Sequence, residues 1–68
     1  MGHGKLANEI KVLRARCDLT QAELAERVGV TRKTINTVEN GHYVPSTVLA
    51  LRIARVFGVP VEEVFRLL

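Results

Sequence analysis

Residues 19–41 read LTQAELAERVGVTRKTINTVENG, and this stretch predicts two short helices joined by a tight turn. Thr20 followed three residues later by Glu23 is typical of a capping box, so the first helix is expected to begin directly after Thr20. Gly29 suits the C-terminal cap of that helix because glycine adopts positive φ readily. Thr31 is then expected to cap a second helix that fills the rest of the stretch. The short connection fixes the second helix at a steep angle to the first.

Three further helices are expected around this pair. Leu6, Ile10 and Leu13 are spaced four and three residues apart, which predicts an amphipathic helix on whose apolar side Cys17 also falls. Pro45 forces the residue before it out of helical geometry, so a loop should precede the next helix. The expected helices cover residues 5–17, 21–28, 32–40 and 47–57, with Ser46 capping the fourth, and a short fifth helix begins near Pro60.

The composition favours a small all-α domain. Hydrophobic residues make up 47% of the chain but aromatic residues only 4%, so the core must come from Leu, Val, Ile and Ala packed at helical spacing. Sixty-eight residues suffice for one domain, and we expect a single one over residues 1–68. The net charge of +3 suits a polyanionic partner, but it also suits an ordinary solvated positive surface.

Several function classes find no support in the sequence. Cys17 is the only cysteine, which excludes an internal disulfide and suits a reducing cytoplasm, and we expect it to be a small apolar residue at a helix end. No segment approaches the roughly 20 apolar residues of a membrane span. His3 and His42 are isolated, and no catalytic set of serine, histidine and acid is present. We therefore expect no metal, no cofactor and no enzymatic activity.

Four polar residues are expected on the exposed face of the second helix of the pair. If that helix lies in the major groove of DNA, its N-terminal residues reach base edges while the helix before it crosses the phosphate backbone. Cations at a helix N-terminus oppose the helix dipole, a cost that an anionic ligand would offset, although a solvated helix end is the alternative. The residues predicted to read bases are Arg32, Lys33, Asn36 and Thr37.

The pattern of residues 19–41 resembles the Xre/Cro-type helix-turn-helix family, which includes the phage repressors. The likeness is carried by Leu19, Thr20, Gln21, Leu24, Ala25, Gly29, Val30, Thr31, Ile35, Glu39, Asn40 and Gly41, and it extends to Pro45, Ile53-Ala54 and Phe57-Gly58-Val59. The resemblance implies an all-α, five-helix, lambda-repressor-like DNA-binding domain whose helix-turn-helix spans about residues 20–41. It also implies a non-enzymatic, sequence-specific regulator of transcription that binds double-stranded DNA.

The resemblance also implies roles for individual residues. It gives Ala25 and Gly29 structural roles, and it makes Arg14 and Glu39 an ion pair that joins the first helix to the end of the third. Base-reading positions of the family are matched by Arg32, Lys33 and Thr37, with Asn36 beside them. Phosphate-binding positions are matched by Gln21, Thr31, Asn40, His42 and Tyr43. An ordinary half-buried loop aromatic is the alternative for Tyr43.

The last third of the chain carries more apolar residues than one core-facing stripe needs. The excess predicts a contact with another chain, and we expect a homodimer that binds a pseudopalindromic operator as a repressor. Scattered exposure on a monomer is the alternative. The alternative functions are an antitoxin-like regulator that binds a second protein, and a protein-interaction module that does not bind DNA. The predicted dimer-interface residues are Val48, Leu51, Phe65, Leu67 and Leu68.

Overall fold

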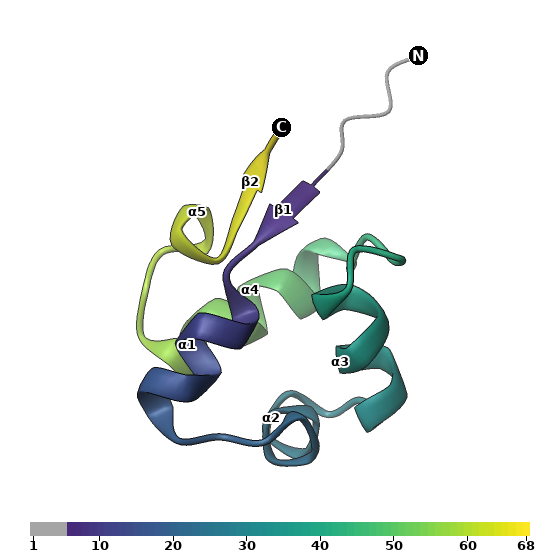
Figure 1. Ribbon diagram of the computed structural model, residues 1–68, viewed down its shortest axis with the longest axis vertical. Coiled ribbons are helices and arrows are strands. Elements are labelled where there is room, and N and C mark those ends of the chain that lie inside the picture. The colour runs from purple at the N-terminus through teal and green to yellow at the C-terminus, as the bar shows by residue number, and fades with distance from the viewer. Residues whose placement is uncertain (1–5) are drawn as a thin grey trace.

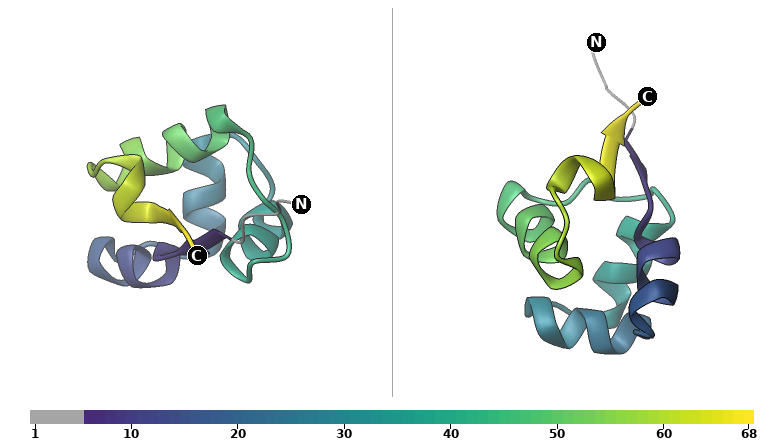
Figure 2. Two further views of the ribbon diagram at one scale, coloured as in Figure 1. Left: turned by 90° about the horizontal axis from the view of Figure 1, so that it is seen from above. Right: turned by 90° about the vertical axis from the view of Figure 1, so that its left-hand side faces the viewer.

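The computed structural model describes residues 6–68, which form five helices and one small antiparallel sheet (Figure 1). The helices are α1 (Ile10–Cys17), α2 (Gln21–Val28), α3 (Arg32–Glu39), α4 (Thr47–Phe57) and α5 (Val61–Val64). The strands are β1 (Leu6–Asn8) and β2 (Phe65–Leu67). The views of Figure 2 show the helices wrapped around a common interior while the sheet projects from one end. The expected all-α, five-helix class is confirmed, with the two-stranded sheet as a minor addition.

Local capping interactions begin and end the helices of the central pair. The Thr20 side chain accepts a hydrogen bond from the Glu23 backbone N–H at 3.0 Å, and the Glu23 carboxylate accepts one from the Thr20 backbone N–H at 2.9 Å. This reciprocal arrangement is the predicted capping box. Gly29 ends α2 in the left-handed conformation, with φ of 80°. The Thr31 hydroxyl then accepts from the Thr34 N–H and begins α3, as expected.

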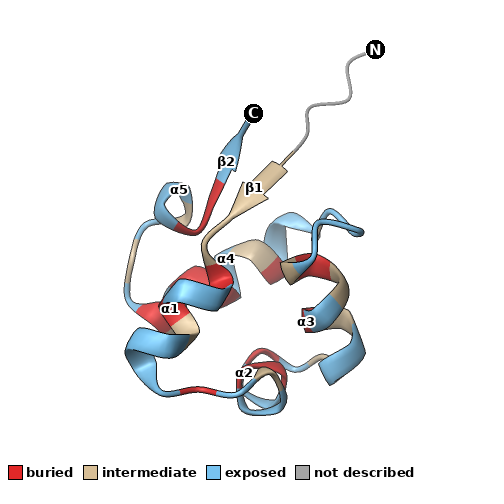
Figure 3. Cartoon of the chain, in the orientation of Figure 1, coloured by how far each residue is buried: buried red, intermediate tan, exposed pale blue. Residues whose placement is uncertain are grey.

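The hydrophobic core draws a fully buried side chain from each of the first four helices. Ile10 of α1, Leu24 of α2, Ile35 of α3 and Ile53 of α4 have no exposed surface. Val64 of α5 closes the same cluster from the C-terminal end. The buried segments accordingly lie on the inner sides of the helices in Figure 3. Since α3 contributes to this core from one side only, its opposite side is left for another role.

The first helix is shorter than predicted. Leu6 lies in β1, where it pairs with Leu67, so the prediction of a helix from residue 5 onward was wrong; Lys5 itself lies outside the described residues. The helix begins only at Ile10, whose backbone N–H donates to the Asn8 side chain. Pairing with a strand at the other end of the described chain overrides the local helical spacing.

Two predictions about burial were also wrong. Cys17, expected on the apolar side of the first helix, is exposed because α1 ends there and the chain turns at Asp18, so that Leu19 reaches the core instead. Phe65, expected at a dimer interface, is only 8% exposed and belongs to the core. Pairing of β2 with β1 lays the Phe65 ring against the helices and leaves Leu67 outside.

The two strands bring the ends of the described chain together in what we call the terminal ribbon, residues 6–8 and 65–67. The Cα partners are Leu6 with Leu67, Ala7 with Arg66, and Asn8 with Phe65. An exposed ion pair between Glu9 and Arg66 (3.0 Å) lies at its base. Within residues 6–68, no helix has the length and apolar character needed to cross a bilayer.

Candidate nucleic-acid interface

The outer side of α3 presents the residues that were predicted to read DNA. Ile35 and Val38 are buried and anchor the helix, so positions on the other side of the helical wheel face outward. Arg32, Lys33 and Asn36 are exposed, and Thr37 is partly buried. The four residues therefore lie on one side of one helix, with Arg32 and Lys33 in its first turn and Asn36 and Thr37 one turn further on.

The N-terminal end of α3 concentrates positive charge. Its first turn contains no acidic residue, and neither Arg32 nor Lys33 forms an ion pair with any residue from 6 to 68. Two cations beside the positive end of a helix dipole repel it, which costs a few tenths of a kcal/mol to about 1 kcal/mol each. An anion such as a phosphate would relieve this repulsion.

The side chain of Thr37 is already engaged within α3. Its hydroxyl donates to the backbone carbonyl of Thr34 at 2.9 Å. The hydroxyl proton is therefore used, and the oxygen lone pairs and the methyl group are what Thr37 can offer to an external ligand. This favours a base-edge donor or a thymine methyl group over a base-edge acceptor.

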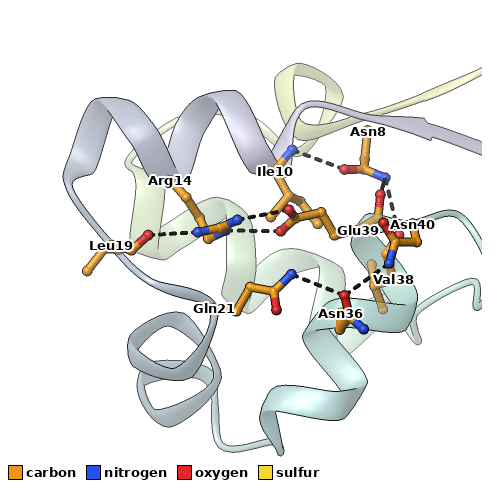
Figure 4. A network of polar contacts seen from close by, with 9 residues as sticks. All are labelled: Asn8, Ile10, Arg14, Leu19, Gln21, Asn36, Val38, Glu39 and Asn40. Carbon is orange, nitrogen blue, oxygen red and sulfur yellow. Dashed lines mark hydrogen bonds and ion pairs between the residues drawn. The ribbon is translucent and has the colours of Figure 1, made fainter.

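A chain of amide side chains joins the start of α2 to the outer side of α3 (Figure 4). Gln21 Nε2 donates to Asn36 Oδ1 at 3.3 Å, and Asn40 Nδ2 donates to the same oxygen at 3.0 Å. The structure thus brings together one predicted base-reading residue and two predicted phosphate-binding residues. All three are hydrogen-bonded on the surface, so the network orients Asn36 without burying it.

The ion pair expected between Arg14 and Glu39 is present. Arg14 Nε and Nη2 donate to the two Glu39 carboxylate oxygens at 3.0 and 2.9 Å, a bidentate arrangement. Arg14 Nη1 also donates to the Leu19 carbonyl at 3.0 Å. The hydrogen bond to Glu39 raises the pKa of Arg14 above its ordinary value, against the opposing effect of burial. Arg14 thereby ties α1 to the loop before α2 and to the last residue of α3.

The loop after α3 extends the same surface. The His42 backbone N–H donates to the Thr37 carbonyl at 2.9 Å, while the His42 side chain is exposed. Tyr43 is 50% exposed, as the alternative interpretation of a half-buried loop aromatic also expects. A shallow hollow of about 230 Å³ lies between Tyr43 and the α3 residues Lys33, Thr34 and Thr37. The loop therefore borders the outer face of α3.

Asn8 is a polar residue of this region that the sequence analysis missed. Its side chain donates to the backbone carbonyls of Val38 and Glu39, both at 3.2 Å, at the end of α3. Asn8 lies one residue before Glu9, the N-cap residue of α1, so no capping signal marked it, although its Oδ1 accepts from the Ile10 backbone N–H. Sequence spacing placed Asn8 inside a helix and hid that role.

Within the described part of the chain, no group of three or more histidine, cysteine, aspartate and glutamate side chains could hold a metal ion. His3, which the sequence left isolated, lies outside the described residues.

Comparisons with known proteins agree on one family. A family model described as helix-turn-helix matches residues 10–64 of this chain. YgzD, an uncharacterized HTH-type transcriptional regulator of Bacillus subtilis, is 48% identical over 60 residues, which are 88% of this chain and 91% of YgzD. The match includes all of the helix-turn-helix and the helices packed against it.

Solved structures show the same fold. A crystal structure from Bacteroides fragilis superposes with a TM-score of 0.80 and 26% identity, covering 90% of this chain and 98% of the other. The restriction-modification controller protein C.AhdI of Aeromonas hydrophila superposes with a TM-score of 0.74 and 30% identity, covering 79% of this chain and 82% of that protein. Both likenesses extend over most of each chain.

Proposed function

The chain belongs to the Xre/Cro-type helix-turn-helix family of non-enzymatic, DNA-binding transcriptional regulators, and we propose that it represses transcription as a homodimer on a pseudopalindromic operator. The observation that carries the proposal is the outer side of α3, where oriented amides lie beside two cations that form no ion pair with residues 6–68. A site in the cytoplasm, beside the chromosome, follows from this function.

In the proposed complex, α3 lies in the major groove and α2 crosses the phosphate backbone. Arg32 at the start of α3 can donate two parallel hydrogen bonds to guanine O6 and N7, and Lys33 can donate to a base or a phosphate. Asn36 and Thr37 complete the proposed base-reading set. The residues proposed to bind phosphates are Gln21, Thr31, Asn40, His42 and Tyr43, which border α3 on both sides.

The proposed dimer uses the exposed side of α4. Val48 and Leu51 are 59% and 53% exposed and line a hollow of about 540 Å³ that continues to Val61 at the start of α5. Arg55 lines the same hollow, and Glu62 follows Val61 directly; neither forms an ion pair within residues 6–68. In the proposed dimer, Arg55 of each protomer pairs with Glu62 of its partner across the twofold axis, beside the apolar centre that Val48 and Leu51 form.

Leu67 of the terminal ribbon and Leu68, which follows it, are also exposed apolar residues. In the homodimer proposal they extend the interface. In the antitoxin-like alternative they would instead bind a second protein.

Repression is the simplest consequence of operator binding, because a dimer that covers a promoter needs no further contact in order to exclude polymerase.

A selection experiment tests the DNA-binding proposal. The purified protein is incubated with a randomised duplex library, and the recovered duplex is compared with a scrambled duplex over a salt series. We expect a preference for the recovered duplex of about a thousandfold and a steep decrease of both affinities with salt. Equal affinity for the two duplexes would contradict the proposal, and absence of binding at low salt would favour the protein-interaction alternative.

Sedimentation equilibrium tests the dimer. Leu51→Lys should shift the protein to the mass of a monomer, because a charge at the centre of an apolar interface is not solvated there. Val12→Lys is the matched control, since Val12 of α1 is similarly exposed at 47% and lies outside the hollow. Leu67→Lys tests the terminal ribbon separately. A wild-type protein that is monomeric at micromolar concentration would contradict the homodimer.

A further inference from the structure

We propose that Asn8 is a positioning residue for base recognition. Its hydrogen bonds join the C-terminal end of α3 to the terminal ribbon and so fix the orientation of α3. The inference rests on the proposed function of α3. It means that base discrimination also depends on a residue far from the reading tip, the N-terminal end of α3 that contains Arg32. Figure 4 shows Asn8 between the start of α1 and the end of α3, on the side away from Gln21.

All polar atoms of the Asn8 side chain are engaged. Nδ2 donates to the Val38 and Glu39 carbonyls at 3.2 Å each, and Oδ1 accepts from the Ile10 backbone N–H at 3.1 Å. Carbonyl oxygens can only accept and a backbone N–H can only donate, so these partners fix the orientation of the amide. No other side chain of similar size supplies two donors and an acceptor in this geometry.

The two carbonyls that Asn8 contacts belong to the last turn of α3, where carbonyls lack i+4 partners within the helix. The Val38 carbonyl also accepts from the Gly41 backbone N–H at 3.0 Å. The side chain of Glu39 is held separately by Arg14. The end of α3 is therefore fastened twice to the N-terminal part of the chain, once through the Glu39 carboxylate and once through the backbone carbonyls.

Asn8 is itself held by the ribbon. It pairs with Phe65, whose ring is buried in the core, and the neighbouring Glu9 backbone N–H donates to the Val64 carbonyl at 2.9 Å. The two contacts fix the backbone at Asn8 and at Glu9. The contacts that position α3 thus involve residues from both ends of the described chain.

A small tilt of α3 about its fastened end has a large effect at its other end. Arg32 lies about 10 Å along the helix from Glu39, so a tilt of roughly 5° moves the reading tip by about 1 Å. A displacement of that size is enough to break a base-edge hydrogen bond. Electrostatic attraction between basic side chains and phosphates changes much less over the same displacement. Loss of the Asn8 contacts should therefore weaken base discrimination more than general DNA binding.

The test measures the affinity of each variant for the duplex that the wild-type protein selects and for a scrambled duplex. Asn8→Ala removes all three hydrogen bonds, whereas Asn8→Asp keeps the acceptor and loses both donors. Both variants should reduce the ratio of the two affinities by about tenfold, with scrambled-duplex affinity changed by less than about twofold. Measurements are made at a temperature at which every variant is fully folded.

Two control variants separate positioning from stability. Arg66→Ala removes the exposed Glu9–Arg66 ion pair on the same ribbon and leaves the contacts to α3 in place. Val56→Ala removes methyl groups that pack against the core from α4. Both should keep the wild-type affinity ratio. An unchanged ratio in Asn8→Ala and Asn8→Asp, or an equal reduction in Val56→Ala, would overturn the inference.

Amide hydrogen exchange gives a readout that does not depend on DNA. The Asn40 and His42 backbone N–H groups donate to the Asn36 and Thr37 carbonyls at 3.0 and 2.9 Å. Exchange of these amides should be faster in Asn8→Ala than in Val56→Ala, relative to the core amide of Ile53. If the wild-type protein shows no sequence preference, the proposed function fails. Amide hydrogen exchange then still tests whether Asn8 positions α3. Equal exchange in the two variants overturns that role.

Discussion

Replacing Glu39 by alanine should destabilise the fold substantially. The Arg14 and Glu39 side chains are only 16% and 8% exposed, and the bidentate contact spans 2.9 and 3.0 Å. Removing one partner of a fully buried ion pair costs about 3–5 kcal/mol, because the remaining charge stays desolvated. Arg14 keeps its hydrogen bond to the Leu19 carbonyl and some exposure to water, so we expect a loss of about 2–3 kcal/mol.

Urea unfolding followed by circular dichroism measures this loss, and in a thermal scan each kcal/mol should lower the melting temperature by roughly 4–8 °C. All variants are compared at one protein concentration, since dimerisation would shift apparent stability. Adding Arg14→Ala to Glu39→Ala should cost less than the sum of the single changes, because the first change already removes the interaction. A loss below about 0.5 kcal/mol for Glu39→Ala would refute the assignment of the pair as a structural brace.

The remaining predictions concern the caps of α2. Hydrogen bonds from the Thr20 backbone N–H and side chain lower the pKa of Glu23 below its ordinary 4.5. The ionised Glu23 carboxylate therefore stabilises the folded protein above pH 4.5, and this contribution is lost as the pH falls through the lowered pKa. Unfolding from about pH 6 to about pH 3 should therefore show a smaller loss of stability in Glu23→Gln than in the wild type; parallel profiles would contradict this. Gly29→Ala should cost about 1–2 kcal/mol, because φ is 80° while the nearest atom to a new Cβ, Arg52 Nη1, is 3.7 Å away and leaves room. Gly29→Asn should cost less, since asparagine tolerates that conformation, and equal losses in chemical unfolding would show that space rather than φ is decisive.

The sequence could predict the helix-turn-helix because its signals are local. Thr20, Glu23, Gly29 and Thr31 act within four residues of their partners. Thr20, Glu23 and Thr31 cap helix starts through their side chains, and Gly29 ends α2 through its backbone. The same locality explains why the four outward polar residues of α3 fall on one side.

The terminal ribbon could not be predicted in this way. Leu6 has the spacing of a helical residue relative to Ile10, yet it pairs with Leu67 from the opposite end of the chain. Strands of three residues are too short for alternation to be distinguished from helical periodicity. Burial of Phe65 and the contact of Asn8 with α3 both depend on that pairing, so the misplaced dimer residue and the missed positioning residue have one physical origin.

The most direct test of the central claim, that the outer side of α3 reads DNA, compares the base preferences of two arginine variants. Wild type, Arg32→Ala and Arg27→Ala are each used to select duplexes from the same randomised library, with Arg27 as an exposed arginine in the last turn of α2. Arg32→Ala should lose about 1–3 kcal/mol of affinity and relax the preference at one base pair in each half-site, while Arg27→Ala keeps the wild-type preference. A uniform loss of affinity on all sequences in Arg32→Ala, with every base preference retained, would contradict base reading by the tip of α3.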